Sequence, residues 1–127
     1  MPTALAAAGA ALWMGRWWLE WHHHQVRLAQ IPLRIHVNGT RGKSTVTRLI
    51  AAGLRYAGRI TVAKTTGSAA RFIYPDGSEI PWPRRGNPNI REQLAVVQRA
   101  HTLRAQALVL ECMALKPEIQ WVAERIF

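Results

Sequence analysis

Hydrophobic and polar residues follow one another along this chain in a pattern that predicts an α/β order of elements. Residues 33–37 alternate and include branched side chains, so we expect a strand there. Apolar positions over 45–57 have helical spacing up to Gly58, a typical helix stop. A second short strand is expected at 60–63. The turn residues 75–78 lie between two further strand-like runs, which predicts a hairpin.

The second half of the chain continues with a loop, a helix and a strand. Residues 81–88 contain three prolines and one glycine, which is typical of a loop. A helix is expected over 89–106, with Glu92 as the capping-box partner of its first residue. The apolar run 107–110 predicts a buried strand that ends at Glu111.

These elements predict an α/β fold with a mostly parallel sheet, flanking helices and a last helix that begins at Lys116. An apolar helix is expected before this body, which divides the chain into an N-terminal segment, 1–24, and a body, 25–127. Three strong strands make a thin sheet for such a fold. We therefore expect the chain to be the N-terminal part of a larger domain.

The N-terminal segment has features of a membrane anchor. Residues 3–15 are apolar, and four tryptophans lie between residues 13 and 21. Thirteen helical residues span about 20 Å, less than the roughly 30 Å hydrocarbon core, so a crossing needs residues beyond Arg16. Tryptophans mark membrane interfaces, and the basic residues that follow place the body in the cytoplasm. We expect membrane anchoring; an interfacial or signal segment, or a helix packed on the body, are the alternatives.

The composition indicates that the chain folds and that its partner is anionic. Of the 127 residues, 49% are hydrophobic and 19% charged, which is typical of a folded domain. A single cysteine, Cys112, excludes a disulfide scaffold or a multi-cysteine zinc module. The net charge of +10 arises mostly between residues 40 and 105. Its partner could be nucleotide phosphate, nucleic acid, lipid head groups or a polycarboxylate.

One sequence motif favours nucleotide phosphate over the other partners. The segment 39–44 reads Gly-Thr-Arg-Gly-Lys-Ser between a predicted strand and helix, the context of a phosphate-binding loop in a shortened form. Glycines let backbone N–H groups turn toward phosphate oxygens, and a helix N-terminus favours anions. Lys43 would reach the β- and γ-phosphates, and the Ser44 hydroxyl would bind Mg²⁺. The predicted nucleotide-binding residues are Gly39, Thr40, Arg41, Gly42, Lys43, Ser44 and Thr45.

Glu111 is the second chemical feature. A carboxylate that closes an apolar strand is costly to bury unpaired. In an open α/β sheet the carboxyl ends of the strands line the ligand crevice. Ser44 and Glu111 are therefore predicted to share a metal ion, with a helix-capping or salt-bridging glutamate as the alternative.

Two weaker candidates concern the substrate. Thr65 and Thr66 follow a predicted strand, where their hydroxyls could bind metal or substrate, or belong to an ordinary turn. Arg84 and Arg85 could hold a carboxylate or phosphate through two parallel hydrogen bonds, or form a solvated charge pair.

Longer strings in the sequence resemble a known family. The G-T-x-G-K-[ST] loop within 35–48 resembles the nucleotide loop of the Mur-ligase superfamily. Further segments resemble the ligase subunit of poly-γ-glutamate synthase (PgsB/CapB type), over about residues 27–127. These segments are Ala63–Gly67, Arg84–Gly86, Asn89–Ile90, Glu92–Gln93 and Leu110–Ala114.

The resemblance implies an ATP-dependent amide ligase that extends poly-γ-glutamate. ATP would phosphorylate the terminal carboxylate of the chain, and the amine of the next glutamate would attack the acyl phosphate. Lys43 and Glu111 would be catalytic, and Ser44 and Glu111 would hold Mg²⁺. The implied partners are glutamate, poly-γ-glutamate, the membrane and membrane-bound synthase subunits. Family members are much longer, so the resemblance also implies a truncated chain.

Two other function classes stay open on sequence grounds. One is a different phosphate-loop enzyme, such as a small-molecule kinase. The other is a membrane or nucleic-acid binding module driven by charge. Aromatic side chains that could stack on bases are sparse in the basic region, so we expect no nucleic-acid partner.

Overall fold

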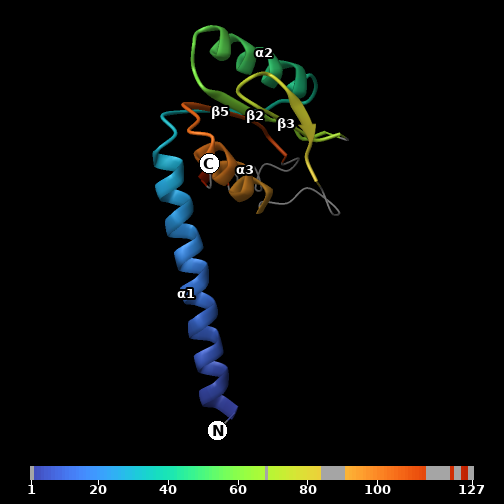
Figure 1. Cartoon of the computed structure of the whole chain (residues 1–127). Helices are drawn as coiled ribbons and strands as arrows, with labels where there is room; N and C mark the ends of the chain where they lie inside the picture. The colour runs from blue at the N-terminus through green and yellow to red at the C-terminus, as the bar shows by residue number, and fades with distance from the viewer. Residues whose placement is uncertain (1, 68, 84–90, 114–120, 122–123, 126–127) are drawn as a thin grey trace.

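The computed structural model describes residues 2–67, 69–83, 91–113, 121 and 124–125 (Figure 1). The predicted strands and the hairpin are confirmed, and no strand end differs from its predicted position by more than one residue. The predicted last helix at Lys116 begins outside the described residues. The elements are α1 (Pro2–Ala29), β1 (Leu33–Val37), α2 (Lys43–Tyr56), β2 (Thr61–Lys64), β3 (Arg71–Ile73), β4 (Glu79–Pro81), α3 (Arg91–Thr102) and β5 (Ala107–Glu111).

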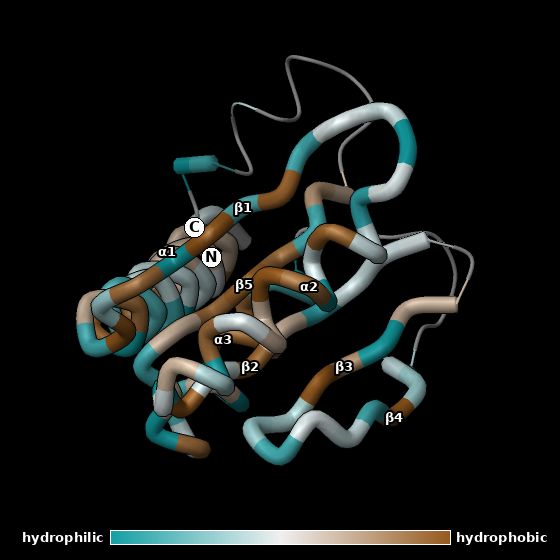
Figure 2. The backbone as a smooth tube through the Cα atoms, turned by 90° about the horizontal axis from the view of Figure 1, so that it is seen from above, coloured by the Kyte–Doolittle hydropathy of each residue, from teal (hydrophilic) through white to brown (hydrophobic). Residues whose placement is uncertain are grey.

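The sheet is mixed, whereas we expected a mostly parallel one. Its order is β1-β5-β2-β3-β4, which Figure 2 shows from above, with α2 in front of the sheet. β1, β5 and β2 are parallel neighbours, and β3 and β4 join antiparallel. The physical reason is that the connections from β2 to β3 and from β3 to β4 are too short for a parallel crossover, and the second of them is a tight turn. The N–H of Tyr74 donates to the carbonyl of Ser78, Gly77 has a φ of 87°, and Asp76 accepts hydrogen bonds from Ser78.

Helices cover both faces of this sheet, as Figure 1 shows. On one face, Ala51 of α2 packs in a core with alternate residues of the strands, among them Ala63 and Val109. On the other face, α3 and the end of α1 pack against the intervening residues. This second core contains Leu28, Val62, Phe72, Val96, Val97, Ala100, Leu108 and Leu110.

α3 ends earlier than the expected residue 106. Arg104 has a φ of 52°, in the left-handed region. The N–H of Ala105 donates to the carbonyl of Ala100, and that of Arg104 to His101, which is a Schellman ending. The apolar spacing continues past this point, but residues 105 and 106 already lead into β5. Sequence spacing therefore overestimated the helix at its C-terminal end.

α1 is one continuous helix of 28 residues that extends away from the sheet (Figure 1). The boundary that we placed after residue 24 therefore lies inside a helix. The last turns of α1 pack on α3, where Leu28 is buried. Around the middle of α1, Trp13, Trp17 and Trp18 are 60–70% exposed. Within the described part of the chain, no helix has the length and hydropathy that a membrane crossing requires.

Candidate functional site

The candidate site lies where the three parallel strands end. Val37 of β1 is in register with Glu111 of β5, and Lys64 of β2 is in register with Leu110. Because the strands are parallel, the segments that follow them leave the sheet at the same edge. This edge therefore brings together the glycine-rich loop, the residues after β2 and the end of β5.

The loop between β1 and α2 has the backbone of an anion-binding turn. Gly39 has a φ of 148°, and its N–H donates to Oδ1 of Asn38 over 2.8 Å. Gly42, the residue before α2, has a φ of 76°, a left-handed conformation that glycine adopts without strain. Thr40 and Arg41 between them are exposed. The loop backbone is therefore accessible at the N-terminus of α2, where N–H groups attract anions.

Lys43 and Ser44 are the first two residues of α2, and Thr45 follows them. The Ser44 hydroxyl donates a hydrogen bond of 2.7 Å to Oε2 of Glu111. Val109, two residues before Glu111, belongs to the core beneath α2, so the Glu111 side chain leaves the sheet on the α2 face. The structure therefore brings together the two residues that we predicted to share a metal ion.

Thr66 completes the contacts of this carboxylate. Its backbone N–H donates to the same oxygen, Oε2 of Glu111, over 2.8 Å. Thr65, its neighbour, uses its hydroxyl oxygen to accept from the N–H of Arg71. Both threonines are buried. The segment after β2 thus lies at the site, with Thr66 contacting Glu111 through its backbone and Thr65 joined to the hairpin.

The other predicted substrate residues, Arg84 and Arg85, lie outside the described residues. Asn89, the expected cap of α3, lies outside them as well. Glu92, its expected partner, forms an ion pair with Lys64, in which Oε2 lies 3.0 Å from Nζ. Our local spacing argument did not anticipate this contact between a helix and a strand.

The donor set at Ser44 and Glu111 fits a magnesium ion. Ser44 donates its proton to the carboxylate, which leaves the lone pairs of its oxygen for a cation. Both side chains offer oxygen, the ligand type of Mg²⁺, and Mg²⁺ keeps several waters and substrate phosphates as its other ligands. Among the described residues, no group of three or more His, Cys, Asp or Glu side chains could hold a metal by itself.

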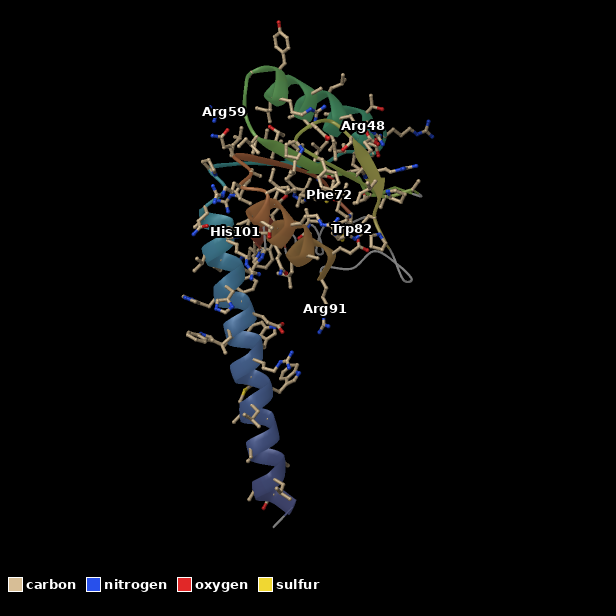
Figure 3. All side chains as sticks on the ribbon, in the orientation of Figure 1. Arg48, Arg59, Phe72, Trp82, Arg91 and His101 are labelled. Atoms are coloured by element: carbon tan, nitrogen blue, oxygen red, sulfur yellow. The ribbon has the colours of Figure 1, made fainter. Side chains whose placement is uncertain are left out.

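One further ion pair links α2 to the hairpin. Nε of Arg48, one turn after Ser44, lies 2.8 Å from Oε1 of Glu79, and Figure 3 shows Arg48 beside the hairpin. The hydrogen bond from Arg48 lowers the pKa of Glu79 below its ordinary value. Since these side chains are about a third exposed or more, solvent screening keeps the contribution of the pair small.

Sequence reasoning missed two contributions to this edge. The N–H of Thr66 carries no side-chain signal, and only the adjacency of β2 and β5 places it at Glu111. Lys64 and Glu92 are 28 residues apart in the sequence and meet only when α3 packs on β2. A charged residue at the end of a mostly apolar strand was the one available hint.

Comparisons with known proteins bear on this arrangement. The chain is 50% identical over 99 residues to "Capsule biosynthesis protein CapB" of Bacillus anthracis. It is 47% identical over 104 residues to "PGA synthase CapB" of Bacillus subtilis (strain 168). Over this stretch the chain is similar to the CapB proteins. The resemblance to the PgsB/CapB type, stated from the motifs, is thereby confirmed.

The aligned stretch covers most of this chain but only a small part of each relative. The aligned residues make up 76% and 80% of this chain but 21% and 26% of the two CapB proteins. The chain therefore spans about a quarter of the length of these relatives. No family model and no solved structure matches the chain.

Proposed function

We propose that this chain supplies the nucleotide-binding part of an ATP-dependent amide ligase in poly-γ-glutamate synthesis. The observation that carries the proposal is the hydrogen bond from Ser44, at the start of α2, to Glu111, at the end of β5. It joins a glycine-rich loop to a carboxylate at the edge where nucleotide phosphates bind in α/β sheets. The CapB relatives, one of them named a PGA synthase, support the choice of polymer.

In the proposed reaction, the terminal carboxylate of a glutamate chain attacks the γ-phosphorus of ATP. The bond between the γ-phosphorus and the bridging oxygen breaks, and ADP leaves. The amine of the incoming glutamate then attacks the acyl phosphate, which releases phosphate and a proton and forms the amide. Mg²⁺, when bound, neutralises charge on the phosphate oxygens. Such a reaction needs positioning and charge stabilisation more than covalent work from the protein.

Each residue of the loop has a role in this scheme. The backbone N–H groups from Gly39 to Ser44 surround the phosphates, and the left-handed Gly42 turns the chain into α2. The Lys43 ammonium binds the β- and γ-phosphate oxygens as a point charge. Ser44 and Glu111 hold the magnesium ion.

We further propose that α1 attaches the chain to a membrane. Its exposed tryptophans present large amphipathic rings, which favour the membrane–water interface. The high net positive charge supports an anionic surface as the partner.

Calorimetry on the whole chain tests the nucleotide proposal. We expect saturable ATP binding that tightens when EDTA is replaced by Mg²⁺ and that depends only weakly on salt. Binding that is unchanged by Mg²⁺ and falls steeply with salt contradicts the proposal and supports a charge-driven surface instead. Transfer of phosphate to an acceptor without a carboxylate supports a kinase.

A further inference from the structure

Lys64 is a charged residue in the interior of the fold. It is the last residue of β2, and its side chain is 2% exposed. Val62, two residues earlier, packs in the core beneath α3, so Lys64 faces α3 as well. Its Nζ lies 3.0 Å from Oε2 of Glu92, a residue of α3 with a 9% exposed side chain. The ammonium is therefore enclosed between a strand and a helix.

Aromatic side chains surround the same ion pair. Nζ of Lys64 lies 5.7 Å from the ring centroid of Trp82. The guanidinium of Arg99, on α3, lies 5.2 Å from the centroids of both Phe72 and Trp82. Figure 3 shows Phe72 and Trp82 on the α3 side of the sheet. α3 is thus held to the end of β2 and to the hairpin by two cations and two rings.

A buried ion pair is a costly way to fill this space. Apolar side chains of similar volume in such positions often give equal or greater stability, because two charges lose their hydration on burial. What the pair adds is a fixed distance and direction between two elements. At Lys64 this constraint acts on the last residue of a strand that leads directly into the candidate site.

The backbone carries this constraint to Glu111. Lys64 is followed by Thr65, whose N–H donates to the carbonyl of Arg71 over 2.9 Å. The next N–H, that of Thr66, donates to Oε2 of Glu111. One residue therefore separates the buried ammonium on the α3 face from a hydrogen bond to the carboxylate on the α2 face.

We propose that Lys64 is a positioning residue for Glu111. Its ion pair with Glu92 fixes the backbone after β2, so that the Thr66 N–H holds Glu111 Oε2 in place to accept the Ser44 hydroxyl. This inference rests on the proposed function, in which Ser44 and Glu111 hold Mg²⁺. Residues that orient metal ligands in this way commonly change metal affinity tenfold to a hundredfold when they are altered.

The test uses the whole chain and replaces both members of the pair. Lys64→Met with Glu92→Met removes both charges at similar volume, which avoids a single uncompensated charge. Lys64→Arg keeps the ion pair. Arg48→Met with Glu79→Met is the matched control, because it removes a more exposed ion pair that links α2 to the hairpin. For each protein we would measure the amide exchange of Thr66 and the affinity for ATP with Mg²⁺ and with EDTA.

We expect the Lys64/Glu92 double variant to exchange the Thr66 amide about tenfold faster or more. Its Mg²⁺-dependent gain in ATP affinity should fall by about tenfold, while ATP binding in EDTA stays unchanged. Lys64→Arg and the Arg48/Glu79 control should resemble the wild type. A double variant with wild-type amide protection and wild-type Mg²⁺ dependence overturns the inference.

Two further outcomes remain decisive. If the double variant does not fold, we would measure Glu92→Asp instead. This variant retracts the carboxylate by one methylene and keeps both charges. Wild-type protection of Thr66 in that variant then overturns the inference, and faster exchange supports it. If the wild type shows no Mg²⁺-dependent ATP binding, the proposed function fails, and the exchange of Thr66 still decides whether Lys64 positions the strand end.

Discussion

The Ser44 hydroxyl and the Glu111 carboxylate, 67 positions apart in the sequence, are joined by a hydrogen bond of 2.7 Å. The bond links the first turn of α2 to the end of β5, at the edge where the parallel strands end. Because Thr66 donates to the same oxygen, three chain segments meet at one carboxylate oxygen. A change at Glu111 should therefore affect both the fold and any metal held there.

Glu111→Gln tests these two effects separately. The amide oxygen can still accept hydrogen bonds, but without the negative charge these bonds weaken, so we expect the free energy of unfolding to fall by about 1–2 kcal/mol. A neutral amide oxygen binds Mg²⁺ more weakly than a carboxylate, so most of the Mg²⁺-dependent gain in ATP affinity should disappear. Urea unfolding and calorimetry measure the two quantities.

The matched control is Glu20→Gln on α1, where the carboxylate is 64% exposed. It removes the same charge and should leave both quantities at wild-type values. A Glu111→Gln protein that keeps its Mg²⁺ dependence would show that the metal is held elsewhere.

Lys43→Ala tests the loop. Removal of a charge-assisted contact to phosphate should weaken ATP binding about ten- to hundredfold. Arg59→Ala removes one positive charge beyond the other end of α2, as Figure 3 shows, and should leave the affinity within about twofold. Calorimetry at a single salt concentration compares the three proteins. Equal losses in both variants would indicate a general charge effect in place of a phosphate site.

Gly42→Ala tests the left-handed turn before α2. A Cβ atom at Gly42 would meet nothing within 4 Å, so the cost is that of the φ of 76° alone, about 1–2 kcal/mol. Gly53, inside α2, has equally open surroundings, and Gly53→Ala should stabilise by up to about 1 kcal/mol. Opposite shifts in the urea midpoint would support the turn geometry; shifts of the same sign would argue against it.

The sequence predicted the local parts of this site because local signals determine them. Glycines at 39 and 42 mark a turn before a helix, and a carboxylate after four apolar residues marks a strand end. Parallel strands share an edge, so Ser44 and Glu111 were expected to meet. Each of these arguments needs only short stretches of sequence.

The remaining features depend on strand order, which no short stretch encodes. β5 lies between β1 and β2 although it comes last among the strands. That insertion brings Thr66 to Glu111, and the packing of α3 on β2 brings Glu92 to Lys64. The end of α3 was missed because Arg104 adopts a left-handed conformation that glycine usually signals.

The exposed tryptophans of α1 lead to a prediction about membranes. Vesicles with one quarter phosphatidylserine should sediment the chain, and Trp13→Ala with Trp17→Ala and Trp18→Ala should weaken binding at least tenfold, roughly the loss of one buried aromatic side chain or more. Trp121→Ala is the control, since Trp121 is also exposed but lies near the C-terminus. Equal binding by the triple variant and the control would remove the proposed role of α1.

The last prediction concerns His36, a half-buried residue of β1. Burial lowers its pKa below the ordinary value of 6.5, and the charge of Glu124 opposes this shift only in part. Below pH 6.5 the unfolded chain therefore takes up a proton that the folded chain does not. Stability should fall as the pH drops from about 6.5 toward the lower folded pKa, with a slope of at most about 1.4 kcal/mol per pH unit.

Urea unfolding between pH 7.5 and 5.5 measures this loss, in a range above the titration of ordinary carboxyl groups. His36→Gln removes the titrating group, so its stability should depend less on pH than that of the wild type, and the two curves should converge above pH 7. Parallel curves over the whole range would mean that the imidazole titrates alike in the folded and unfolded chain, in conflict with the burial of His36 on β1.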